Sequence, residues 1–124
     1  YVKKKEEVYD VTGENDPRIG AAEDVSRMVG MGTATAPVDL TPQLRPLYTA
    51  EARAAGVTGI TMLEIVVSNE GQVLRVRTVG KKLGYGLDEA AAATFRQKKF
   101  QPSMDLSGKA LTVKFYQPVR FVLN

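Results

Sequence analysis

The sequence contains no histidine and no cysteine among its 124 residues. Histidine is the commonest general base and metal ligand at neutral pH, and cysteine supplies thiolate nucleophiles and disulfides. Their absence removes thiolate chemistry, disulfide bridges and the histidine-based catalytic arrangements. Any remaining chemistry must come from serines, carboxylates and basic side chains.

These remaining side chains do not form a recognisable catalytic or metal-binding pattern. No serine has a lysine three residues later that could activate it, and Gly80-Lys81-Lys82 lacks the upstream glycine of a phosphate-binding loop. Asp88 and Glu89 are neighbours on a predicted helix, so their carboxyl groups do not face each other as an acid–base pair would. We therefore predict that the protein is not an enzyme and has no cofactor and no metal site.

The basic residues of the second half could alternatively form a patch that binds nucleic acid. The residues concerned are Lys98, Lys99, Lys109, Lys114 and Arg120. The formal net charge is only +3, and the aromatic residues do not form a cluster on which bases could stack. A solvated basic face is the better interpretation, and we predict no nucleic-acid partner.

The longest periodic pattern lies at the C-terminus, in residues 109–124. Odd positions from Leu111 to Leu123 are mostly apolar, whereas even positions are mostly polar, and this period of two predicts one long strand with its odd face on a core. Pro118 has no N–H group, which a sheet tolerates mainly at an edge. We expect an open edge strand that can bind another extended segment.

Four further elements precede this strand. Thr49 and Gly56 are the predicted ends of a short helix. Residues 58–67 and 72–79 are predicted to form a hairpin with a bulge. Residues 87–99 are predicted to form a second helix. The basic side chains at its end would complement the helix dipole. The directions of these elements predict an α+β fold with a three-stranded antiparallel sheet, in the order second, first, last, and both helices on one face.

Residues 1–46 differ from the rest of the chain in composition and in hydrophobic pattern. They hold six basic and eight acidic residues and four of the six prolines, and they show no sustained period. We predict a flexible N-terminal linker or extension over 1–46, with one short helix near residues 21–29, and a folded domain over 47–124. Because the chain begins at Tyr1 rather than methionine, we also expect an upstream part.

The outer face of the predicted sheet has no helix to cover it. Its apolar side chains would be Ile60, Met62, Val66 and Tyr116. Such a stripe could support a weak homodimer, or the N-terminal segment could cover it.

Five short segments occur in an order and spacing that point to a known family. They are Tyr48-Thr49-Ala50-Glu51-Ala52-Arg53 with Gly56-Val57-Thr58-Gly59, Asn69-Glu70-Gly71-Gln72-Val73, Leu87-Asp88-Glu89-Ala90-Ala91, Phe100-Gln101-Pro102 and Pro118-Val119-Arg120-Phe121. Together they resemble the C-terminal domain of TonB, the periplasmic energy transducer of Gram-negative bacteria, over residues 47–123. The chain departs from the family pattern at Thr49, where proline is usual, and at Lys98, where an aromatic residue is often found.

The resemblance implies a periplasmic domain that is anchored in the inner membrane by a segment outside this chain and is coupled there to a proton-driven motor. It also implies that the last strand binds the TonB box, a short peptide of an outer-membrane transporter, by strand addition. The residues expected to bind it are Thr112, Val113, Lys114, Phe115, Tyr116 and Gln117, with Tyr48 as a secondary contact. A TonB-like domain of another trans-envelope machine, such as a surface motility system, is the alternative.

Overall fold

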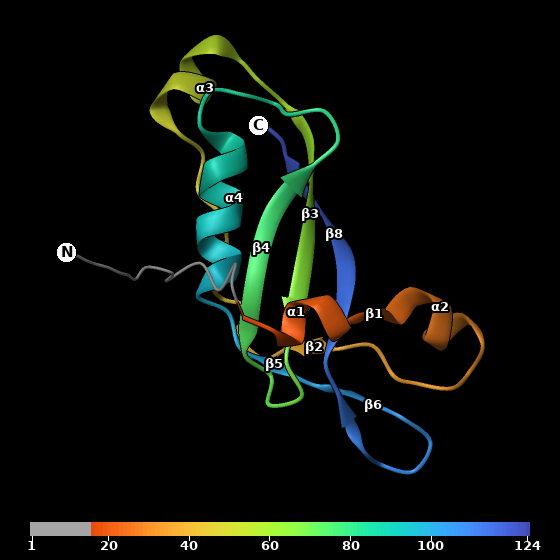
Figure 1. Cartoon of the computed structure of the whole chain (residues 1–124). Helices are drawn as coiled ribbons and strands as arrows, with labels where there is room; N and C mark the ends of the chain where they lie inside the picture. The colour runs from red at the N-terminus through yellow and green to blue at the C-terminus, as the bar shows by residue number, and fades with distance from the viewer. Residues whose placement is uncertain (1–15) are drawn as a thin grey trace, which may run out of the picture.

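The computed structural model describes residues 16–124 and has an α+β fold, as the sequence predicts (Figure 1). The elements in chain order are α1 (Arg18–Ala21), β1 (Glu23–Asp24), α2 (Val25–Gly30), β2 (Val38–Asp39), α3 (Ala50–Ala55), β3 (Gly59–Val67), β4 (Val73–Val79), α4 (Leu87–Arg96), β5 (Phe100–Gln101), β6 (Ser103–Met104), β7 (Ala110–Leu111) and β8 (Val113–Phe121).

The main sheet has four strands in the order β1–β8–β3–β4. β3 is antiparallel to both β4 and β8, whereas β1 is parallel to β8. The three predicted strands lie side by side in the predicted order, as β4, β3 and β8, and are antiparallel. The prediction of a sheet with three strands only was wrong, because the N-terminal segment adds a fourth strand in parallel to β8. Two small sheets accompany it, one formed by β2 and β5 and the other by β6 and β7.

The β3–β4 hairpin has the irregularity that its apolar pattern predicts. The register between the two strands shifts at Val66 and Val67, so that β4 carries one extra residue there. Leu74 and Val76 are buried, as expected for the inward face of β4. The turn depends on Gly71, whose φ is +83°, because a Cβ there would lie 1.9 Å from the carbonyl oxygen of Phe100.

The core lies between the sheet and helices α3 and α4. Its fully buried side chains include Leu63 and Ile65 from β3, Ala52 from α3, and Leu87 and Ala91 from α4. These side chains explain why the helices form where they do: each presents small or apolar residues to the sheet. Two caps fix the shorter helix, since Thr49 Oγ1 accepts a hydrogen bond from Ala52 N at 3.1 Å and Gly56 takes the left-handed conformation.

The C-terminal run presents the faces that its alternation predicts. Val113, Val119 and Phe121 are buried, whereas Tyr116 and Arg120 are exposed. The run is not one continuous strand, however. It is interrupted at Thr112, whose Oγ1 accepts a hydrogen bond from Asn69 N at 3.0 Å, and β7 pairs with β6 in a separate hairpin.

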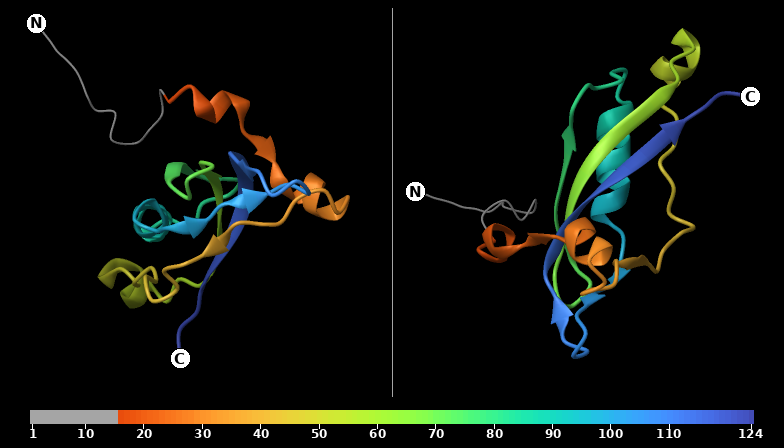
Figure 2. Two further views of the ribbon diagram at one scale, coloured as in Figure 1. Left: turned by 90° about the horizontal axis from the view of Figure 1, so that it is seen from below. Right: turned by 90° about the vertical axis from the view of Figure 1, so that its right-hand side faces the viewer.

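Part of the predicted N-terminal extension contacts the domain. Residues 16–30 cross the lower half of the sheet, and α1 and α4 lie on opposite faces of it (Figures 1 and 2). Residues 33–40 then follow the strands after α4, where Thr35 N donates to Met104 O and Leu40 N donates to Lys99 O, both at 2.9 Å. Residues 1–15 lie outside the described part, and the flexibility of 1–46 and the boundary at 46/47 stay predictions.

Candidate functional site: the edge of the C-terminal strand

The outer edge of β8 is the part of the sheet that could accept another strand. Alternate residues of a strand direct their backbone groups to opposite neighbours. Ser68 N donates to Gln72 O at 2.8 Å across the β3–β4 turn, so even-numbered residues of β3 face β4 and odd-numbered ones face β8. Gln117 is the register partner of Leu63, and Tyr116 that of Glu64. The odd residues of β8 therefore bond to β3, and its even residues point to the outer edge.

Four residues of β8 point outward by this alternation, and they are not equivalent. Lys114 is the register partner of Asp24 in β1, so its edge is occupied. Pro118 has no backbone N–H. Its register partner in β3 is Met62, and this pair is one of those that are not joined by hydrogen bonds between the strands, so the sheet tolerates proline there. The Pro118 carbonyl accepts the side-chain amide of Gln117 at 3.0 Å. Tyr116 and Arg120 remain, and within residues 16–124 no strand pairs with them on this side.

The six residues predicted to bind a partner are therefore split by the structure. Thr112 is held by Asn69, and Val113 and Lys114 pair with β1. The other three, Phe115, Tyr116 and Gln117, lie on the stretch of β8 beyond β1. Phe115 also packs inward, with its ring 5.6 Å from that of Phe100 in an edge-to-face contact.

Two grooves run beside this stretch of the edge and meet at Gln117. One, of about 450 Å³, lies between α2 and β8 and is mainly apolar, with Val25, Val29, Pro37 and Phe115 in its lining. The other, of about 330 Å³, continues along the strand past Pro118 to Phe121. Arg45, Pro42 and Pro46 from the N-terminal segment form part of its wall. A strand added to β8 would place alternate side chains in these grooves.

On the outer face of the sheet, Glu64 organises a polar cluster that reaches this edge. Its carboxylate is 2.7 Å from Arg75 Nη2 and 2.8 Å from Arg77 Nε, and it accepts a hydrogen bond from Tyr116 Oη at 3.2 Å. Burial raises the pKa of Glu64, but these bonds outweigh it, and the pKa lies below its usual value. The pKa of Tyr116 is raised because its hydroxyl is bound to this anion. The cluster fixes the Tyr116 side chain beside its outward-facing backbone.

The stripe of apolar residues predicted on this outer face is only partly exposed. Val66 is fully buried, whereas Ile60 is 42% and Tyr116 is 45% exposed. Val25 of the N-terminal segment is itself only 3% exposed. A weak homodimer through the exposed part stays a prediction.

Lys98 is not a solvated capping charge as predicted. Helix α4 ends at Arg96, and the Lys98 side chain, 3% exposed, turns inward. Its Nζ donates to Leu44 O at 2.6 Å and Thr41 O at 2.9 Å and lies 2.9 Å from Asp39 Oδ2. Burial raises the pKa of Asp39, but the bonds from Lys98 and Thr41 outweigh it and lower that pKa. Lys98 thereby ties the N-terminal segment to the domain beside the second groove.

Tyr48, the predicted secondary contact, lies at the far end of β8. Its hydroxyl donates to Val57 O at 2.7 Å, and its ring is 5.5 Å from that of Phe121 in an edge-to-face contact. The guanidinium of Arg53 lies 5.2 Å from the centre of the same ring. These contacts pack the partly buried Tyr48 against the core, and a direct contact with a partner stays a prediction.

Asp88 has a structural role that the sequence did not reveal. Its carboxylate accepts hydrogen bonds from the backbone of Gly84 at 2.8 Å and of Leu83 at 3.1 Å, and also from Thr61 Oγ1. Burial raises the pKa of Asp88, but these donors outweigh it and hold the pKa below its usual value. Asp88 thus joins the loop before α4 to the centre of β3, with no catalytic partner among these contacts.

Other kinds of site find no support within residues 16–124. No three acidic, histidine or cysteine side chains there are grouped so that they could hold a metal ion. None of the helices in this range combines the length and apolar character needed to cross a membrane. The backbone edge of β8 and its two grooves are thus the surface that the geometry favours.

Comparison with known proteins agrees with this geometry. The chain is 29% identical over 88 residues to Protein TonB of Vibrio cholerae serotype O1, a match that covers 71% of this chain and 36% of that relative. Residues 45–123 match the family described as Gram-negative bacterial TonB protein C-terminal, which is a non-enzymatic domain family. This match includes α3, both strands of the hairpin, α4 and β8. The chain therefore belongs to the TonB C-terminal domain family, as its short segments predict.

Proposed function

We propose that this domain binds an extended peptide of an outer-membrane TonB-dependent transporter by strand addition to the outer edge of β8. The observation that carries the proposal is the outward direction of the Tyr116 and Arg120 backbone groups on a domain of this family. Affinity would come mainly from main-chain hydrogen bonds, since an edge offers alternate N–H and C=O groups to any extended chain. The two grooves at Gln117 would receive side chains and adjust the choice of peptide.

The domain would act in the periplasm as the partner-binding end of a longer energy transducer. Family membership supports this role, and the matched region is only about a third of the Vibrio relative's length. In this proposal, an N-terminal part anchored in the inner membrane receives energy from a proton-driven motor. The peptide bound at β8 passes that energy to the transporter.

The decisive substitution is Tyr116→Pro, which removes an outward N–H from the middle of the proposed binding edge. Tyr116→Ala is the matched control, because it also removes the phenol that contacts Glu64 but keeps the N–H. Loss of one hydrogen bond of about 1.4 kcal/mol corresponds to about tenfold in affinity. We expect Tyr116→Pro to bind a TonB-box peptide about tenfold more weakly than Tyr116→Ala, by calorimetry, with similar unfolding midpoints for the two variants.

Phe115→Pro tests the direction of the backbone, since the Phe115 N–H faces β3. We expect this variant to lower the stability of the domain itself, by a few kcal/mol. Chemical-shift mapping then locates the peptide on the protein. Shifts confined to α3 or α4, with Tyr116, Gln117 and Arg120 unaffected, would contradict strand addition.

A further inference from the structure

The chain already adds a strand of its own to the proposed binding edge. Glu23 and Asp24 pair with Val113 and Lys114 of β8 in parallel, and α2 begins at the next residue. We infer that residues 22–30, here called the arm, compete with the partner peptide for the edge of β8 and must leave it before a full-length strand can add. This inference rests on the proposed function and concerns how the same edge is regulated.

The position of the arm determines how much edge a partner can reach. Of the four outward-facing residues, Lys114 is taken by β1 and Pro118 has no N–H, which leaves two N–H donors, those of Tyr116 and Arg120. Helix α2 contacts β8, and its residues line the groove at Phe115 and Gln117, the two neighbours of Tyr116 in the chain. An incoming strand therefore gains a donor, an acceptor and space when the arm leaves.

The contacts that hold the arm have the size expected of a displaceable segment. β1 has two residues and α2 has six, and neither length is stable without packing. Val25 is the one buried residue of α2, with 3% exposure, and Asp24 caps the helix through Ser26 N at 3.0 Å. Few buried contacts and a short hydrogen-bonded segment mark a region of low local stability.

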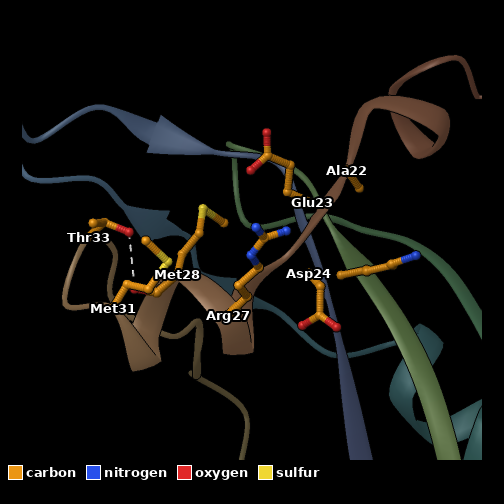
Figure 3. A pocket seen from close by; sticks show the side chains of 8 residues that line it. Ala22, Glu23, Asp24, Arg27, Met28, Met31 and Thr33 are labelled. Carbon is orange, nitrogen blue, oxygen red and sulfur yellow. Dashed lines mark hydrogen bonds between the residues drawn. The ribbon is translucent and has the colours of Figure 1, made fainter.

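An open groove borders the arm. This groove, of about 670 Å³, is lined by residues of the arm together with Lys114 of β8. Figure 3 shows Met28, Met31 and Arg27 around it, with Glu23 and Asp24 pointing to different sides of the segment. Glu23 and Met31 are exposed. The arm thus covers the edge with Val25 as its one buried side chain within residues 22–30.

A disulfide between the arm and the edge tests the inference in the full chain. Asp24 and Lys114 are register partners, and neighbouring strands lie about 4.8 Å apart, within the Cα separation that a disulfide spans. The natural sequence has no cysteine, so Asp24→Cys with Lys114→Cys creates a single defined pair. The oxidised and reduced forms of this one protein are the matched states, with the arm locked in the first and releasable in the second.

The probe is a synthetic TonB-box peptide of an outer-membrane transporter from the same organism, and its Kd is measured in both states. The reduced form should bind it about tenfold more tightly than the oxidised form, because the backbone of Lys114 becomes available. Val25→Asp in the otherwise natural chain, which removes the arm's buried anchor, should bind at least as tightly as the reduced form. Met31→Asp is its control, since Met31 is 68% exposed, and it should bind like the natural chain.

The outcomes separate this inference from the proposed function. Equal affinity of the oxidised and reduced forms, with shifts at Tyr116 and Arg120, would overturn competition by the arm and leave strand addition standing. Absence of binding in both forms and in Val25→Asp would overturn strand addition itself, and the inference with it. Peptide-induced loss of the helical shifts of α2 in the natural chain would support displacement directly.

Discussion

The substitution Lys98→Met tests the buried ammonium group that joins the N-terminal segment to the residues after α4. Methionine keeps the unbranched stem and much of the volume of lysine, so packing on Phe95, whose ring centre is 5.0 Å from Nζ, can be retained. The variant loses the ion pair with Asp39 and the two hydrogen bonds to the carbonyls of Thr41 and Leu44. All three N–H donors of the ammonium group have a partner in the native state. Methionine has no donor, so it leaves all three acceptors without the partner that they have in the natural protein.

The expected cost follows from the burial of these groups. A hydrogen bond to a charged group contributes about 1.5–3 kcal/mol, and breaking a buried ion pair costs about 3–5 kcal/mol. The side chain of Lys98 is 3% exposed but that of Asp39 is 31% exposed, so water can rehydrate the carboxylate in the variant. We therefore expect the free energy of unfolding to fall by about 3 kcal/mol, which lowers Tm by roughly 10 °C for a domain of this size.

Two measurements check this expectation against a neighbouring control. Lys99→Met removes an exposed lysine, and its own backbone carbonyl still accepts from Leu40 N at 2.9 Å. Denaturant unfolding gives the global effect, and amide exchange at Leu40 reports whether the segment detaches locally. Equal stability and equal Leu40 exchange in the two variants would refute the structural role assigned to Lys98.

Two further substitutions test the hairpin turn at Gly71 and the buried carboxylate of Asp88. Gly71→Ala should destabilise the domain by about 3 kcal/mol or more, because its Cβ would meet Phe100 O at 1.9 Å, whereas Gly108→Ala, with a similar φ of +84° but no atom within 4 Å, should cost only about 1–2 kcal/mol. The pKa of Asp88 is lower in the folded state than its value of about 3.8 in the unfolded state, so ionised Asp88 stabilises the fold. This stabilisation is fully present at pH values above 3.8 and is lost as the pH falls from there through the folded pKa. The acid unfolding curve of Asp88→Asn should therefore be flatter than that of the natural chain, and parallel curves would contradict the role of Asp88.

The elements that were predictable from the sequence are those whose cause is local. The alternation of residues 111–123 requires only that one face be apolar, and Thr49 and Gly56 terminate α3 by hydrogen bonding and backbone conformation within a few residues. The position of Pro118 likewise indicates an edge because the ring removes a donor wherever it stands. Such local signals do not depend on contacts with distant parts of the chain.

The elements that escaped prediction depend on contacts far apart in the sequence. β1 is two residues long and pairs with residues about ninety positions away, so it has no period to detect. Lys98 follows the end of α4, where a basic residue ordinarily complements the helix dipole. It turns inward because the carbonyls of Thr41 and Leu44 and the carboxylate of Asp39, all distant in sequence, bind its ammonium group.

One missed feature did leave a trace in the sequence. Glu64 is an acidic residue within an otherwise apolar strand, and the hairpin register sets it opposite Arg77. A buried carboxylate in a central strand requires a cationic partner. Arg75 and Arg77 alternate on the next strand of the hairpin, and this spacing is the sequence signal that indicates such a partner.

In the proposed function, the edge of β8 must resist unwanted pairing and still accept one specific strand. An exposed edge invites aggregation, and natural sheets protect edges with proline, charges and short covering segments. Here Pro118 withholds a donor, the Gln117 amide occupies the Pro118 carbonyl, and the arm covers Lys114. The Gln117 bond and the pairing of the arm each consist of one or a few hydrogen bonds, so a matching peptide could displace them, whereas the missing N–H of Pro118 is permanent. Under the proposed displacement, such an edge would resist aggregation without a partner and would offer the additional backbone groups of Lys114 once the arm leaves.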